Sequence, residues 1–264
     1  MSFFSAANIS AGYGKNQIIT NLSFETQRSC LTGILGANGS GKTTLLKAIC
    51  GILPHQGTCM LENFRLESLS VRQIAKLCGY IPQCSGISID ISVLDVVLMG
   101  FNPQLGLLEQ PTKQMRSAAL FAIEQVGLTG KAHRNYQHLS EGQKQLCILA
   151  RTLVTDSRLL LLDEPESALD FRYRYQVLTL LRKWVAEKQA GAIITLHDPM
   201  LALNYCDQLL ILSDGNLLGT IYPRTDSLKD MEQLLCTIYG TISLQYAVTK
   251  SGQCQLIMLN EESI

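Results

Sequence analysis

The chain has 264 residues, 47% of them hydrophobic and 17% charged, so it can bury a sizeable core. Lys plus Arg and Asp plus Glu number 22 each, which excludes recruitment of nucleic acid or anionic lipid by overall charge. No apolar run approaches the roughly 18 residues of a membrane span, and we expect no signal peptide in MSFFSAANIS. The nine cysteines lack C-x-x-C or zinc-like spacing and indicate core thiols in a reducing cytosol.

The first third of the chain predicts strands followed by one helix. The opening thirty residues are typical of a β-hairpin, because Asn21 to Thr26 alternates polar and apolar side chains. A short buried strand is expected over Leu31 to Leu35. A helix is expected over Thr44 to Cys50, closed by Gly51 and Pro54.

The remaining chain alternates predicted helices with apolar strands. We expect helices within Ile89 to Thr155, with an irregular connector at Pro103 and Pro111, and another helix over Tyr173 to Lys188. Strands are expected over Arg158 to Asp163 and over Ala192 to Leu196. A hairpin is expected at Asp214-Gly215 within Leu209 to Gly219, and a second one over Ile242 to Leu259, turning near Ser251-Gly252. This order predicts an α/β core with a mostly parallel sheet and a helical insertion. Arg172 and Arg174 do not share a helix face, so the aromatic FRYRY segment predicts a solvated surface and no nucleic-acid partner.

A phosphate-binding loop follows the first buried strand. Gly36, Gly41, Lys42 and Thr43 match the pattern G-x-x-x-x-G-K-[ST]. Glycines let backbone N–H groups turn toward an anion, Lys42 can reach the β- and γ-phosphates, and the Thr43 hydroxyl can bind Mg²⁺. The helix that starts at this loop adds partial positive charge. The segment therefore predicts binding of a nucleoside triphosphate with Mg²⁺.

Two carboxylates end the strand that stops at Asp163. An acid at the carboxyl end of a strand beside a phosphate loop can hold Mg²⁺ or its water shell. We therefore expect Asp163 to bind the metal. Glu164 can orient and deprotonate an attacking water. Upstream, Ser140 and Gln143 form a capping-box pattern, so Ser140 is expected to begin a helix whose N-terminus is a second potential anion site.

Together these segments resemble the ATP-binding subunit of an ABC transporter, nearly end to end and in the expected order. Gly36 to Thr44 resembles the Walker A motif, Leu139 to Gln143 the LSGGQ signature, and Leu159 to Glu164 the Walker B strand. Gln83 resembles the Q-loop glutamine, Ser167 to Asp170 the D-loop, and His197 the switch histidine. Tyr13 stands where the family places an aromatic that stacks on adenine.

The resemblance implies a P-loop NTPase core, an antiparallel β subdomain, an inserted helical subdomain, and two copies that sandwich ATP head to tail. It implies that the Walker A residues of one copy hold the phosphates while Ser140 and the Gly142 amide of the other cap the γ-phosphate. Glu164 is then the general base, His197 positions the water, and Gln83 touches the metal. The ATP-binding residues implied are Tyr13, Gly36, Asn38, Gly39, Ser40, Gly41, Lys42, Thr43, Thr44, Gln83, Ser140, Gly142, Gln143 and Asp170; the catalytic ones are Glu164, His197 and Lys42; the Mg²⁺ ligands are Thr43, Gln83 and Asp163.

Two residues depart from the family pattern. Glu141 replaces the first glycine of LSGGQ and brings a carboxylate near the expected γ-phosphate, although it also suits the helix dipole. Because Ser140 and Gly142 remain, we expect a working site. Glu166 stands where the family usually has Thr or Ser, and the sequence offers no physical account of it.

Two further segments indicate the class of transporter, with less specific patterns than the nucleotide-binding motifs. Ser92 to Leu108 and Leu66 to Ile74 resemble ATPases of iron–siderophore, haem and cobalamin importers. Molybdate or tungstate importers, and a non-transport ABC ATPase, remain alternatives. A P-loop kinase leaves LSEGQ and His197 unexplained, and Glu164 argues against a module that only binds ATP.

The resemblance implies one domain, with a core over 1–83 and 158–220, a helical subdomain over 84–157 and a C-terminal extension over 221–264. Its partners would be an identical ATPase subunit, permease subunits docked on roughly Ser92 to Leu128, and indirectly a substrate-binding protein. The expected location is the cytoplasmic face of a bacterial or archaeal membrane.

Overall fold

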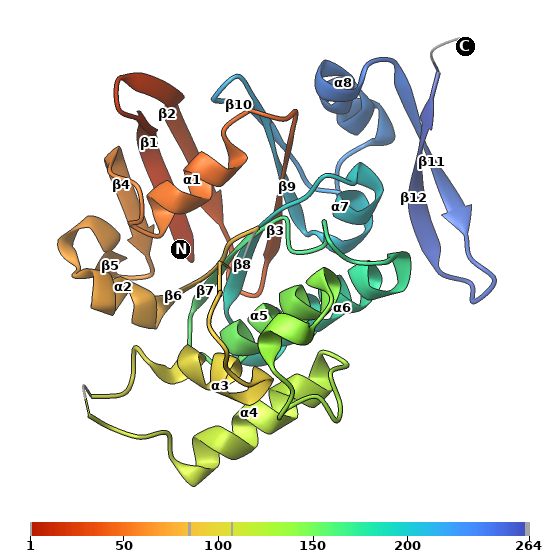
Figure 1. The fold of residues 1–264 in the computed structure, drawn as a ribbon. Helices are drawn as coiled ribbons and strands as arrows, with labels where there is room; N and C mark the ends of the chain where they lie inside the picture. Colours follow the sequence, from red (N-terminus) through yellow and green to blue (C-terminus); the bar gives the residue numbers. More distant parts are fainter. Residues whose placement is uncertain (1, 84–85, 107, 262–264) are drawn as a thin grey trace.

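The computed structural model describes residues 2–83, 86–106 and 108–261, and six strands form its central sheet (Figure 1). The strand order is β10-β9-β3-β8-β7-β6, in which only β10 runs antiparallel to its neighbour. The bounds are β3 Leu31–Gly36, β6 Cys78–Ile81, β7 Leu159–Asp163, β8 Gly191–Thr195, β9 Gln208–Ser213 and β10 Asn216–Ile221. The predicted mostly parallel sheet is confirmed.

Continuous apolar runs form the inner strands because both faces of this sheet are covered. In β7, Leu159 and Leu161 join one buried cluster while Leu160 and Leu162 join the other. All five residues of β7 are buried, as are all five of β8. A strand with both faces buried needs apolar side chains at every position, which explains why the pattern lacks alternation.

An antiparallel sheet covers one face together with helix α1. Its strand order is β2-β1-β4-β5, and the described bounds are β1 Phe4–Tyr13, β2 Asn16–Thr26, β4 His55–Leu61, β5 Phe64–Arg65 and α1 Lys42–Ile49. Leu45 and Leu46 of α1 are buried in one cluster with Phe4 and Ile9 of β1. The hairpin predicted for the first thirty residues is confirmed, and α1 begins two residues before the predicted start at Thr44.

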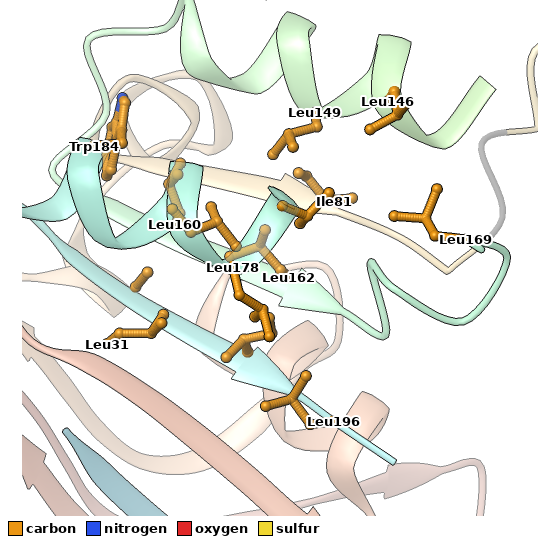
Figure 2. Close-up of a cluster of buried hydrophobic side chains, with 14 of the residues drawn as sticks. Leu31, Ile81, Leu146, Leu149, Leu160, Leu162, Leu169, Leu178, Trp184 and Leu196 are labelled. Carbon is orange, nitrogen blue, oxygen red and sulfur yellow. The ribbon is translucent and has the colours of Figure 1, made fainter. Parts of the chain in front are cut away.

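Helices cover the opposite face. They are α3 Val93–Leu98, α4 Lys113–Gln125, α5 Glu141–Leu153 and α6 Phe171–Lys188. Helix α2 Val71–Leu77 lies beside β6 and buries Ile74 in the cluster on the side of the antiparallel sheet. Short 3₁₀ turns lie at Leu66–Ser68, Met99–Phe101 and Tyr136–His138. Figure 2 shows Leu146 and Leu149 of α5 directed toward Ile81 of β6, beside Leu160 and Leu162 of β7. Thr112 and Ser140 accept backbone N–H groups at the starts of α4 and α5, as expected for N-cap residues. The predicted boundary at residue 84 lies outside the described residues, and the division into subdomains stays a prediction.

The C-terminal part adds helices α7 Pro199–Tyr205 and α8 Leu228–Tyr239 and the hairpin of β11 Ile242–Val248 with β12 Cys254–Asn260. This hairpin projects beside α7 and α8 (Figure 1). The hairpins predicted at Asp214-Gly215 and over Ile242 to Leu259 are confirmed, whereas neither α7 nor α8 was predicted. Across the described ranges, no helix is long and apolar enough to cross a membrane. The eight cysteines that the structure describes are free; five of them are buried and two are half-buried against the core, in line with the expected core thiols.

Candidate active site

Four neighbouring parallel strands deliver the predicted functional residues to one edge of the central sheet. In the order β3-β8-β7-β6, their carboxyl ends lead into Gly36, Thr195, Asp163 and Gln83. Ligands bind at the carboxyl ends of strands in open α/β sheets, because the loops there converge. Residues separated by up to 159 positions along the chain thus lie together.

The phosphate loop is shaped by its glycines. Gly39 and Gly41 adopt φ values of 82° and 99°, which side chains rarely tolerate. A Cβ on Gly36 would lie 2.3 Å from the Leu212 carbonyl oxygen and 2.6 Å from Ser40 Oγ, so no larger residue fits. Gly41 is the N-cap of α1, whose first N–H groups face the loop without helical partners.

Lys42 lies inside this loop. Its Nζ donates to the carbonyl oxygens of Gly36 at 2.8 Å and Ala37 at 3.0 Å. Burial lowers the pKa of Lys42, and the carboxylates of Glu164 and Asp163 oppose that shift. Among the described residues the hydrogen bonds of this ammonium go to neutral carbonyls, so an anion bound there would offset its desolvation.

Asp163 and Thr43 present oxygen ligands side by side. Thr43 Oγ1 donates to Asp163 Oδ1 at 3.0 Å, and Asp163 is 2% exposed. A hydroxyl next to a carboxylate suits Mg²⁺, which prefers oxygen ligands and takes only one or two carboxylates. The residues present therefore fit the expected metal.

Both oxygens of the Glu164 carboxylate are held. His197 Nε2 lies 2.6 Å from Oε1, and Gln83 Nε2 donates to Oε2 at 2.6 Å. Glu164 has a φ of 48°, a conformation unusual for a residue with a side chain. The backbone turns sharply where β7 ends and directs this carboxylate toward the phosphate loop, with which it shares a hollow.

That hollow has a volume of about 250 Å³. It is lined by Tyr13, Ile18, Asn38, Gly39, Ser40, Gly41, Lys42, Thr43, Thr44 and Glu164. Tyr13 is 48% exposed at the end of β1, so its ring is available for stacking. It also lines a larger hollow of about 600 Å³ between the β1–β2 turn and residues 53–56.

The predicted signature residues line a different hollow. Ser140, Gly142, Gln143 and Asp170 surround a volume of about 530 Å³ that shares no lining residue with the hollow at the phosphate loop. Ser140 and Gln143 form the predicted capping box at the start of α5. One chain therefore does not bring its signature residues onto its own phosphate loop, which is the arrangement expected if a second copy completes the site.

Comparison with known proteins agrees with this geometry. The sequence profile described as ABC transporter matches residues 19–167, more than half of the chain. The chain belongs to the ABC transporter family. The Hemin import ATP-binding protein HmuV of Bordetella pertussis is 37% identical over 221 residues, which cover 80% of this chain and 83% of that protein. The ABC transporter family is thus shown both by its profile and by a relative that matches most of its length.

Solved structures agree at the level of fold. A metal-chelate type ABC transporter in an inward-facing conformation matches with a TM-score of 0.82 and 26% identity over 99% of both chains. A dimeric ATP-binding cassette bound to ADP and Pi matches with a TM-score of 0.75 and 22% identity over 84% of this chain and 100% of that one. The chain is an ABC ATPase, and the predicted P-loop fold is confirmed.

One residue of this ABC ATPase site was missed from the sequence. Thr195 Oγ1 donates to Asp163 Oδ1 at 2.9 Å and accepts the Glu164 N–H at 2.8 Å. It is fully buried at the end of β8 and holds two of the predicted site residues at once. Its only sequence signal was its place at the end of an apolar strand, one residue before Leu196.

The two departures from the ABC pattern have defined surroundings. Glu141 is exposed and forms an ion pair of 2.8 Å with Lys144 one turn later, which offsets its charge near the signature hollow. Glu166 is buried, and its Oε1 accepts the His197 N–H at 3.3 Å. Burial raises the pKa of Glu166 to about 7, with Glu164 adding to the rise and the hydrogen bonds from backbone N–H groups opposing it.

Proposed function

We propose that this ABC ATPase powers the import of a metal chelate, such as an iron–siderophore, haem or cobalamin, through a partner permease. The main support for ATP hydrolysis is the position of the Glu164 carboxylate. His197 and Gln83 hold it beside Lys42 and Thr43. The cargo class is supported by the hemin import protein and the metal-chelate transporter that the chain resembles.

The phosphates of ATP would lie on the loop around Lys42. The ammonium then exchanges its two carbonyl contacts for the β- and γ-phosphate oxygens, and the loop N–H groups add further donors. Tyr13 would stack on adenine at the exposed end of the same hollow. Asn38, Gly39, Ser40, Gly41 and Thr44 complete this cradle.

Thr43, Asp163 and Gln83 are the residues that would hold Mg²⁺, which supplies charge neutralisation on the phosphate oxygens. Glu164 would accept a proton from the attacking water, because its carboxylate lines the same hollow as the phosphate loop. His197 orients the carboxylate through Oε1 and would contact the γ-phosphate.

A second copy would supply the other half of the site. Its Ser140 hydroxyl and Gly142 amide would cap the γ-phosphate, with Gln143 and Asp170 nearby at the same hollow. A Cβ on Gly142 would lie 3.0 Å from the Ala168 carbonyl oxygen, so a glycine lets this segment pack closely. The separation of the two hollows within one chain supports a head-to-tail pair.

The permease would dock on the helical side of the molecule. A groove of about 240 Å³ lies between α2 and the segment that follows α3. Ile52, Tyr80 and Pro103 are among its lining residues. Gln83 follows β6 near this groove and would report the state of the site to the permease. This arrangement predicts a peripheral location at the cytoplasmic face of the membrane, with a substrate-binding protein acting only through the permease.

Two measurements test the proposal. Purified protein should hydrolyse ATP, and Glu164→Gln should lower kcat by at least about 100-fold while ATP still binds. Cells that lack the gene should lose growth on haemin or a ferric siderophore as the only iron source and recover it with the wild type but not with Glu164→Gln. Unimpaired hydrolysis by the variant would contradict the catalytic assignment, and unimpaired uptake of every chelate would contradict the cargo.

A further inference from the structure

Glu166 is a buried carboxyl group directly behind the hydrolytic residues. Glu166 is 2% exposed, and its Oε1 accepts the backbone N–H of His197 at 3.3 Å. Within the described residues, Oε2 is buried and has no hydrogen-bond partner. The backbone carbonyl of Glu166 accepts the Leu169 N–H at 3.0 Å, which holds the residue in its turn.

This arrangement costs folding free energy. An ionised carboxylate away from water loses its hydration, and a polar oxygen without a partner loses its hydrogen bonds. The hydroxyl residue usual at this position would avoid most of that cost, since it carries no charge. A local feature that lowers stability at a functional site indicates a compensating gain in function.

The gain lies in the contact with His197. The same residue reaches Glu166 through its backbone N–H and Glu164 through Nε2, so the position of its backbone sets the position of its ring. We propose that Glu166 is a positioning residue for hydrolysis, which fixes the His197 backbone and thereby the imidazole on the Glu164 carboxylate. This inference rests on the proposed function, because it assumes that Glu164 and His197 carry out the hydrolysis.

Protonation of Glu166 would tune this contact. Burial raises its pKa to about 7, and the titratable groups that face it are Glu164 after β7, His197 after β8, and the thiol of Cys206 at the end of α7. An ionised carboxylate accepts a stronger hydrogen bond from an N–H group than a neutral carboxyl does. The His197 backbone is therefore held more firmly above neutral pH than below it.

The test compares steady-state ATPase kinetics of the wild type, Glu166→Gln and Glu166→Ala between about pH 6 and 8.5. Glu166→Ala should lower kcat by about tenfold and leave KM for ATP within about twofold, since only the hydrolytic pair is displaced. Glu166→Gln keeps an acceptor oxygen and should retain most of kcat. The wild type should show a rise of kcat through about pH 7 that is missing from the Gln variant.

The control is Thr26→Val, which alters another buried polar atom without a partner on β2, away from the site. It should leave kcat and its pH profile unchanged, so an effect at Glu166 would not reflect a general loss of stability. Superimposable pH profiles of the wild type and Glu166→Gln, or an unchanged kcat in Glu166→Ala, would overturn the inference while ATP hydrolysis itself stands. A wild type that does not hydrolyse ATP would instead overturn the proposed function on which the inference rests.

Discussion

Nε2 of His197 lies 2.6 Å from Oε1 of Glu164, although the two residues follow different strands. The contact depends on β7 and β8 being neighbours in register, with Asp163 paired to Thr195. Gln83 holds the other oxygen of the carboxylate from the end of β6. The general base of the proposed reaction is thus oriented by two side chains before any ligand contributes.

Removal of the imidazole should therefore impair hydrolysis more than binding. We expect His197→Ala to lower kcat by about 100-fold with KM for ATP within about twofold, because the base loses its orienting group while the phosphate loop is intact. His133→Ala, at an exposed position on the helical side, is the matched control and should behave as the wild type. An equal fall of kcat in both variants, or a rise of KM alone in His197→Ala, would argue against this role.

Thr195 should be important for stability as well as for activity. Thr195→Val keeps the volume but removes the hydroxyl between Asp163 and the Glu164 N–H, which leaves two buried polar groups short of a partner. We expect a loss of about 1–3 kcal/mol in the free energy of unfolding, measured by urea titration, together with lower ATPase activity. Thr26→Val removes a hydroxyl that has no partner among the described residues, so it should cost less. An equal loss of unfolding free energy in Thr195→Val and Thr26→Val would show that the hydrogen bonds of Thr195 do not add to stability.

The sequence predicted the parts of this site that local patterns encode. Gly36 to Thr44 carries its loop conformation in its glycines, and Leu159 to Asp163 predicts a buried strand because it is apolar at every position. Strands β4 and β5 were not predicted, since β4 depends on pairing with β1, about 50 residues earlier, and the two-residue β5 depends on pairing with β4. Thr195 and the partners of Glu166 were missed for a similar reason. A threonine in a strand looks like any β-branched residue until its long-range hydrogen bonds are known.

Glu141 should be tolerated in the signature because Lys144 neutralises it. We expect Lys144→Ala to weaken ATP-dependent pairing of two copies by about two- to fivefold, since an unbalanced carboxylate would face the γ-phosphate. Glu141→Gly in the same background should restore pairing. The effect is measured by sedimentation with ATP in the Glu164→Gln background. Failure of Glu141→Gly to rescue Lys144→Ala would mean that Lys144 acts in another way.

Glu166 should give folding stability a defined pH dependence. Its pKa rises from 4.5 to about 7 in the folded chain, so the folded state holds a proton that the unfolded state releases at lower pH. The associated stability is present below about pH 4.5 and is lost as the pH rises to about 7, by an amount on the order of 3 kcal/mol. Glu166→Gln lacks this titration, so the difference in unfolding free energy between variant and wild type should grow in favour of the variant from pH 5 to 7. A difference that stays constant over this window would contradict the raised pKa.

We expect two copies of this chain to enclose ATP between the phosphate loop of one and the signature hollow of the other. Size-exclusion chromatography of purified Glu164→Gln with and without ATP tests it most directly, because loss of the base should trap the nucleotide. The elution should shift from monomer to dimer only with ATP, and a second change in the signature hollow, Ser140→Arg, should abolish the shift. A chain that binds ATP yet stays monomeric would contradict this arrangement for the isolated subunit, and repeating the run with Glu141→Gly would show whether the carboxylate in the signature is the cause.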